Sequence, residues 1–162
     1  MALPTADLAR RLEPLLRDAG LWRDSFTSDE HAWLLRVLDL LKPRAKRLGQ
    51  FVDDGRLFFV DAIEYDPAAV KKHLSPAGTR GHLVALGAAF EELPAFDQAS
   101  IEACLRGLAD LRGVKAAALI HAARVAVTGK AASPGLFEVL ELIGRPRTLS
   151  RLAAASALAG DQ

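Results

Sequence analysis

Cysteine is nearly absent from this sequence, which holds Cys104 and no other cysteine among its 162 residues. An internal disulfide is therefore excluded, and so is a metal site built from several thiolates. Because Cys104 lies on an apolar helical stripe, we expect a buried, unreactive thiol rather than a nucleophile. A chain with so little cysteine suits a reducing cytoplasm, which is the compartment that we expect.

Long apolar runs and a strong charge of one sign are also missing. No stretch approaches the roughly 20 apolar residues that cross a bilayer, and the N-terminus lacks the apolar core of a secretory signal, so we expect no membrane contact. The formal net charge of +1 excludes a strongly basic RNA-binding tail, although local basic patches remain compatible with it. The frequent Leu and Ala favour helices.

The residue constellations of common enzymes are absent as well. The run "TGK" at 128–130 resembles a phosphate loop, but Arg124 stands where the first glycine belongs and Ala131 where the magnesium-binding hydroxyl belongs. No Gly-x-Ser-x-Gly elbow occurs. No two histidines have the i, i+4 spacing of a helical metal site; the four are His31, His73, His82 and His121. We expect neither catalytic nor metal-binding residues.

The first part of the chain shows helical periodicity interrupted by proline and glycine. Thr5 is the expected cap of a first helix that Gly20 ends and Pro14 kinks or splits. Ser28 is the expected cap of a second helix, and Pro43 interrupts that helix and can begin a shorter one. The segment "LFFV" at 57–60 is the least helical part, expected as a strand or an extended stretch of the core.

The second part continues the helical pattern. Asp66 and Pro67 predict a helix start, Gly129 predicts a helix end, and Ser133 with Pro134 predicts a capped helix. Gly144 is expected to end that helix before a last one. The predicted fold is all-α: a compact cage of about eight to ten helices, in two small subdomains that cover residues 1–66 and 67–162.

The stretch "RVAVTGKAASPGLFEVLELIGRPRTLSRL" resembles the end of bacterial glutamyl-tRNA synthetases. The residues that carry the resemblance are Arg124, Thr128, Gly129, Pro134, Gly135, Gly144, Arg151 and Leu152. Upstream, "LLKPRAKRLGQF", "LFF" and "EYDPAAVKKHL" resemble the anticodon-binding region of the same family. Departures from the family pattern are Ala122 and Ala123, where a proline and a leucine are usual, and Ser133, at the last linker position.

The resemblance implies the anticodon-binding domain of a class I ligase that joins glutamate to its tRNA. Its partners would be the anticodon stem-loop of tRNA-Glu and the catalytic domain of the parent synthetase. Neither "HIGH" nor "KMSKS", the family's ATP-site signatures, occurs in this sequence. We therefore expect an excised or free-standing domain that does not charge tRNA alone. ATP and magnesium would belong to a catalytic domain outside this chain.

By resemblance, Arg124, Ser133, Pro134 and Leu136 lie where family members touch the anticodon. Unpaired bases expose their edges and faces, so a guanidinium, free N–H groups at a helix start and an apolar ledge would each suit them.

By the same resemblance, Arg44 aligns with an arginine that reads the third anticodon base, and a shifted alignment would put Lys42 or Lys46 there. Arg106 and Lys115 are weaker candidates for contacts with the RNA backbone.

Several of these residues also have a purely structural explanation that involves no RNA. Ser133 and Pro134 form a common helix-cap pair that needs no ligand. Arg124 near a helix end would stabilise the helix dipole, and the cluster from Lys42 to Arg47 is by default a solvated face. The alternative function is a free-standing paralogous helical module that binds another RNA or a protein.

Overall fold

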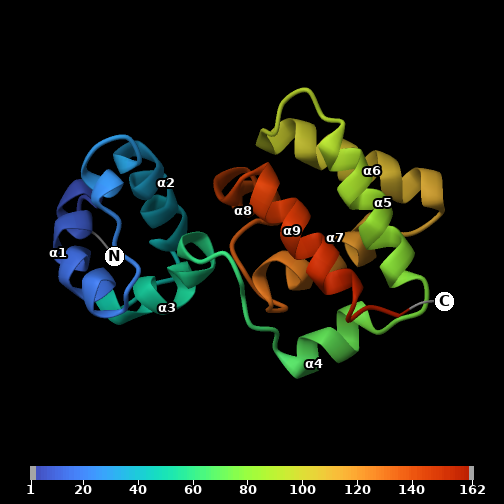
Figure 1. The fold of residues 1–162 in the computed structure, drawn as a ribbon, viewed down its shortest axis with the longest axis horizontal. Helices are drawn as coiled ribbons and strands as arrows, with labels where there is room; N and C mark the ends of the chain where they lie inside the picture. Colours follow the sequence, from blue (N-terminus) through green and yellow to red (C-terminus); the bar gives the residue numbers. More distant parts are fainter. Residues whose placement is uncertain (1–2, 161–162) are drawn as a thin grey trace. The chain divides into compact units, whose positions relative to one another are not determined.

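The computed structural model describes residues 3–160, and it is helical throughout (Figure 1). No β-strand occurs within the described residues, which confirms the all-α prediction. The chain forms two compact units, Met1–Asp61 and Ala62–Gln162. Over residues 3–160 no helix combines the length and the apolar character that a bilayer crossing requires.

The first unit is a small helical bundle. It consists of α1 (Thr5–Asp18), a 3₁₀ turn η1 (Asp24–Thr27), α2 (His31–Leu41) and α3 (Leu48–Phe59). Each α-helix packs against the other two. The apolar face of α1 is buried against them, as Leu8, Leu12 and Leu16 show at most 1% exposure. As predicted, Gly20 follows α1 with a left-handed φ of 73°.

Several predictions for this unit are wrong. Pro14 does not split α1, which runs uninterrupted past it, and the proline side chain faces solvent. Thr5 is not the N-cap of α1, because Pro4 holds that position and the Thr5 hydroxyl bonds Asp39. Ser28 is not the N-cap of α2, which begins at His31 after Glu30. No helix restarts at Pro43, because the chain turns there and α3 starts at Leu48.

In the segment "LFFV", residues 57–59 end α3 and Val60 follows in an extended conformation, so the expected strand or extended core stretch is wrong for residues 57–59. The buried positions of α3 are spaced at helical intervals: Phe51, Val52, Gly55, Phe58 and Phe59. Gly55 allows the close approach of α2, because a Cβ atom there would lie 3.2 Å from Leu41 Cδ1. Aromatic residues such as Phe58 and Phe59 are common in strands, and here the helical spacing of the buried positions outweighs that preference.

The second unit begins with α4 (Pro67–Ala69), which continues into a π-helical turn, η2 (Val70–Leu74). Helices α5 (Thr79–Glu91), α6 (Gln98–Arg112), α7 (Ala116–Thr128), α8 (Leu136–Ile143) and α9 (Arg145–Ser156) follow. Helix α9 packs against α5, α7 and α8 (Figure 1). The π-helical turn packs against α7, which brings two distant parts of the sequence together.

The segment just before α4 belongs to the second unit. The sequence places a boundary after residue 66, whereas the compact units divide after Asp61. The N–H of Asp66 donates to the Gly129 carbonyl at 2.8 Å, and the Tyr65 hydroxyl donates to the Ala126 carbonyl at 2.8 Å. As predicted, Asp66 caps α4, accepting from the N–H of Ala68 at 3.4 Å.

Candidate nucleic-acid interface

The last turn of α7 carries Arg124 on a rigid support. The neighbouring residues Val125, Ala126 and Val127 are fully buried, so they fix the rotation of the helix. The Thr128 hydroxyl donates to the Arg124 carbonyl at 2.7 Å. Gly129 then ends α7 with a φ of 78°, as predicted from the sequence. Arg124 is half-buried and leaves the core at this turn.

Gly129 allows the segment before α4 to lie directly on this turn. A Cβ atom at position 129 would lie 1.9 Å from the carbonyl oxygen of Glu64, a distance that no non-bonded atoms tolerate. The adjacent bond from Asp66 N–H to the Gly129 carbonyl closes the contact. A glycine is thus required at position 129 for two reasons: a side chain has no room there, and the φ angle is left-handed.

Two side chains hold the final carbonyl groups of α7. Tyr65 donates to Ala126, and Nη1 of Arg151 donates to Val127 at 3.0 Å. Arg151 is 2% exposed, so this residue of the family-like motif supports the turn and is not a surface cation. Burial raises the pKa of the Tyr65 hydroxyl, and the nearby Arg151 charge partly opposes that rise.

Arg124 and Ser133 form a direct pair across the loop that follows α7. Nε of Arg124 donates to Oγ of Ser133 at 3.0 Å, and Oγ of Ser133 donates to the Pro134 carbonyl at 2.7 Å. Ser133 therefore does not cap α8, contrary to the prediction; Gly135 is the cap residue and Pro134 precedes the first turn. The hydroxyl is used for the pair with the guanidinium instead.

Leu136 does not provide the expected apolar ledge. Its side chain is 2% exposed and belongs to the core, because α8 buries one face along Leu136, Val139 and Leu140. Pro134 is half-buried and Gly135 is exposed at the start of α8. The surface beside Arg124 is therefore made of Ser133, Pro134 and backbone, without the leucine side chain.

Arg124 also lies close to a histidine of its own helix. Nη1 of Arg124 lies 3.5 Å from Nδ1 of His121, one helical turn earlier on α7. The His121 ring stacks on the His73 ring of η2, with centroids 5.1 Å apart and an interplanar angle of 28°. Burial lowers the pKa of His73, and the charges of His121, Lys72 and Arg124 lower it further. No sequence pattern indicates this cluster, because residues 73 and 121 meet only through the packing of η2 on α7.

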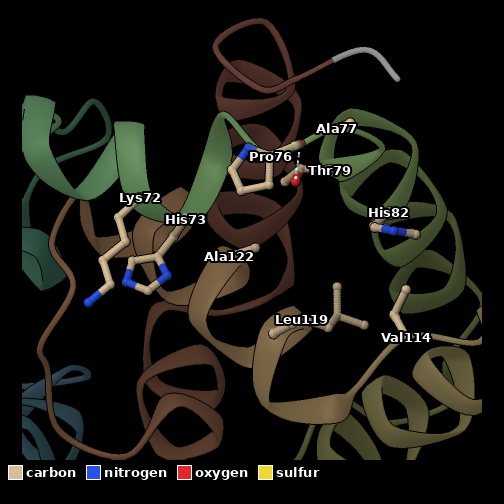
Figure 2. Close-up of a pocket in the computed structure, with 10 residues that line it drawn as sticks. Lys72, His73, Pro76, Ala77, Thr79, His82, Val114, Leu119 and Ala122 are labelled. Carbon is tan, nitrogen blue, oxygen red and sulfur yellow. Dashed lines mark hydrogen bonds between the residues drawn. The ribbon is translucent and has the colours of Figure 1, made fainter.

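A groove of about 240 Å³ is lined in part by Lys72 and His73 of η2, and Figure 2 shows these side chains at its edge. Its floor is apolar and includes Leu119 and Ala122 of α7. Lys72 and His73 lie on one side of it, and His82 lies on the other (Figure 2). No carboxylate belongs to its lining, so the ionisable groups here are all basic.

The basic segment of the first unit lies between α2 and α3. Arg44 and Lys46 are exposed. Lys42 is half-buried, and its Nζ donates to the Leu3 carbonyl at 2.8 Å and to the Thr5 hydroxyl at 3.2 Å. Of the three alternative positions, Lys42 thus fastens the N-terminal segment, while Arg44 and Lys46 present their side chains to solvent.

The remaining predicted residues are distributed over the second unit. Nε of Arg106 contacts Glu102 at 2.9 Å, and the guanidinium lies 5.9 Å from the centre of the Phe137 ring. Lys115 is exposed at the N-terminal end of α7. Cys104 is half-buried rather than buried, and burial raises the pKa of its thiol, which disfavours the reactive thiolate.

Comparison with known proteins connects these features to one family. The family described as "Anticodon binding domain" matches residues 7–156. Glutamate–tRNA ligase 2 of Koribacter versatilis is 44% identical over 119 residues, covering 74% of this chain and 25% of that protein. The glutamate–tRNA ligase of Roseiflexus castenholzii is 38% identical over 154 residues, covering 94% of this chain and 30% of that protein.

The fold has a counterpart among solved structures. A crystal structure of a glutamate tRNA ligase from Elizabethkingia meningosepticum, in complex with its amino acid, is similar with a TM-score of 0.82 and 24% identity. The match covers 96% of this chain and 29% of that one. The chain therefore spans less than a third of the length of these similar proteins.

Proposed function

The chain belongs to the anticodon-binding domain family, and from this premise we propose that it holds the anticodon loop of tRNA-Glu for a glutamate–tRNA ligase. In this proposal a catalytic domain outside the chain binds ATP and magnesium and joins glutamate to the tRNA. The present chain supplies recognition and no catalytic group. It works in the cytoplasm, where tRNA is charged.

The observation that carries the proposal is the pairing of Arg124 with Ser133. The bond between Nε and Oγ fixes a guanidinium at the surface edge of a rigid turn. A planar guanidinium in a fixed position suits an unpaired base, because it stacks on the face of the base or donates two hydrogen bonds to its edge. Pro134 extends this surface beside the pair.

The remaining roles follow from exposure. Arg44 reads the third anticodon base from the first unit, with Lys46 beside it in the same segment. Arg106 and Lys115 contact the RNA backbone. Lys42 contributes to the shape of the basic segment and not to contact, since its amine is bonded within the protein. Leu136 acts from the core by placing the start of α8.

Fluorescence anisotropy with RNA hairpins tests the proposal. A hairpin with the glutamate anticodon should bind the full chain, and its affinity should fall as salt rises, because protein cations release counterions from the phosphates. A matched hairpin with a changed third anticodon base should bind more weakly. Equal affinity for all hairpins would favour the alternative module for another RNA, and no binding to any hairpin would favour a protein partner.

A further inference from the structure

We propose that the stacked rings of His73 and His121, together with Lys72, form a phosphate subsite that takes up a proton when RNA binds. The ligand is a phosphodiester group of the same RNA, next to the nucleotide that Arg124 contacts. This inference rests on the proposed function and deepens it, because it assigns a ligand to the surface beside the Arg124–Ser133 pair.

The first support is the geometry of the cluster. The two imidazole rings stack at 5.1 Å, and His121 lies 3.5 Å from the Arg124 guanidinium. His121 is exposed and His73 is half-buried. Lys72 neighbours His73 on η2, and Figure 2 shows their side chains on the same side of the groove. A phosphate at this point would contact donors from both η2 and α7.

The second support is the balance of charge. The groups that influence His73 are Lys72 on its own turn and His121 and Arg124 on α7, all of them basic. The carboxylate nearest along the chain is Asp66, which is occupied in capping α4. Burial and these like charges disfavour the charged form of His73 in the free protein. A phosphodiester at this point would bring the opposite charge, and it would favour the charged form of His73.

The third support is the backbone that carries Lys72 and His73. Residues Val70–Leu74 form a π-helical turn, a conformation that is rare and often found at functional sites. The wider turn directs His73 onto α7, where it meets His121. An ordinary α-helical continuation of α4 would rotate this side chain by a different amount and change the contact.

The direction of the pH effect follows from the state of His73 in the free protein. Its pKa is lowered there by burial and by the surrounding cations, so the ring is mostly neutral at neutral pH. A bound phosphate raises that pKa, and the complex holds more protons than the free partners. Affinity for RNA therefore rises as pH falls from about 8 toward about 5.5, by at most about tenfold per pH unit for one proton.

The test measures hairpin affinity across this pH range for the full chain and for two variants. His73→Gln keeps a polar side chain that cannot titrate, and His121→Gln removes the ring that stacks on His73, so the rise in affinity at low pH should be reduced or lost in both. His82→Gln is the matched control. Burial and then the charge of Arg112 also lower the pKa of His82, but His82 lies across the groove, and its variant should keep the full pH effect.

A second measurement needs no variant. Nuclear magnetic resonance titration of the histidine rings, with and without the hairpin, should show that the pKa of His73 rises in the complex and that the pKa of His82 does not. Lys72→Ala should also reduce the salt dependence: the slope of log affinity against log salt concentration should become less steep by about one.

The outcomes separate the two proposals. If the unaltered chain binds no hairpin at any pH, the proposed function fails and this inference fails with it. If the chain binds but both histidine variants keep its pH dependence, or if the His73 pKa stays unchanged in the complex, the phosphate subsite is refuted while the proposed function stands.

Discussion

Arg124 donates through Nε to the hydroxyl of Ser133 at 3.0 Å, which links the last turn of α7 to the loop before α8. The two residues are nine positions apart in sequence, yet their side chains share one surface. Because Ser133 holds the Nε edge of the guanidinium, the exposed end of the Arg124 side chain has a fixed position. Recognition by a held side chain loses less conformational entropy than recognition by a mobile one.

Replacing Arg124 tests whether this surface binds RNA. Arg124→Ala should weaken binding of the glutamate hairpin by about 1–3 kcal/mol, the range for a good base contact. Arg124→Lys keeps the charge but lacks the planar fork, so it should recover only part of the loss. Anisotropy measures both affinities, and circular dichroism checks that each variant is folded. Unchanged affinity in a folded Arg124→Ala protein would remove this residue from the site.

A family resemblance and the pattern of helix ends identified Arg124 and Ser133 as candidate site residues from the sequence alone. The local role predicted for Ser133, a helix cap, was wrong. A serine followed by proline is a common helix start, and nothing local indicates that the hydroxyl instead meets a guanidinium. The ends at Gly20, Gly129 and Gly144 were predictable, because a left-handed or extended conformation with positive φ favours glycine. Contacts between distant segments, such as His73 with His121, leave no periodic signal in the sequence.

Discrimination between tRNA species should depend on Arg44. Because this residue is exposed in the segment between α2 and α3, Arg44→Gln should leave the fold intact. We expect a smaller ratio between the affinities for glutamate and glutamine hairpins, by about tenfold for the loss of one base contact. Lys46→Gln serves as the control from the same exposed segment. A ratio that falls only in the lysine variant would move the reading residue to Lys46.

Gly129 should be more important for stability than Gly113, a second glycine with a left-handed φ. Gly129→Ala should lower the free energy of unfolding by more than the roughly 1–3 kcal/mol of backbone strain alone, because its Cβ would lie 1.9 Å from the Glu64 carbonyl. Gly113→Ala is the matched control: it has a similar φ of 69° at the end of α6, with no atom within 4 Å of the added Cβ. Comparing the thermal unfolding of the two variants separates the effect of the Glu64 contact from the effect of the left-handed φ.

A comparable loss in the two glycine variants would show that φ alone sets the requirement. A much larger loss in Gly129→Ala would show that the segment before α4 presses on the α7 turn. The same variant should also weaken hairpin binding, since the turn that carries Arg124 would shift. Gly113→Ala should bind as the unaltered chain does.

Alkaline stability should report on Tyr65, the one tyrosine in the sequence. Burial raises the pKa of its hydroxyl above the ordinary value of 10.0, so the folded state favours the neutral phenol. The stability from this group is fully present below the unfolded pKa of about 10 and is lost as pH rises through the folded pKa. Ultraviolet difference spectroscopy follows the ionisation directly, because no second tyrosine contributes to the signal.

Tyr65→Phe separates this effect from the deprotonation of lysines at the same pH. The variant loses the hydrogen bond to the Ala126 carbonyl, so its free energy of unfolding at neutral pH should fall by about 0.5–1.5 kcal/mol. Its further loss of stability above pH 10 should be smaller than that of the unaltered chain, because the buried phenol is gone. Parallel stability curves across this range would show that Tyr65 ionises in the folded protein as it does in solvent. Equal stability of the two proteins at neutral pH would show that the hydroxyl does not hold the α7 carbonyl.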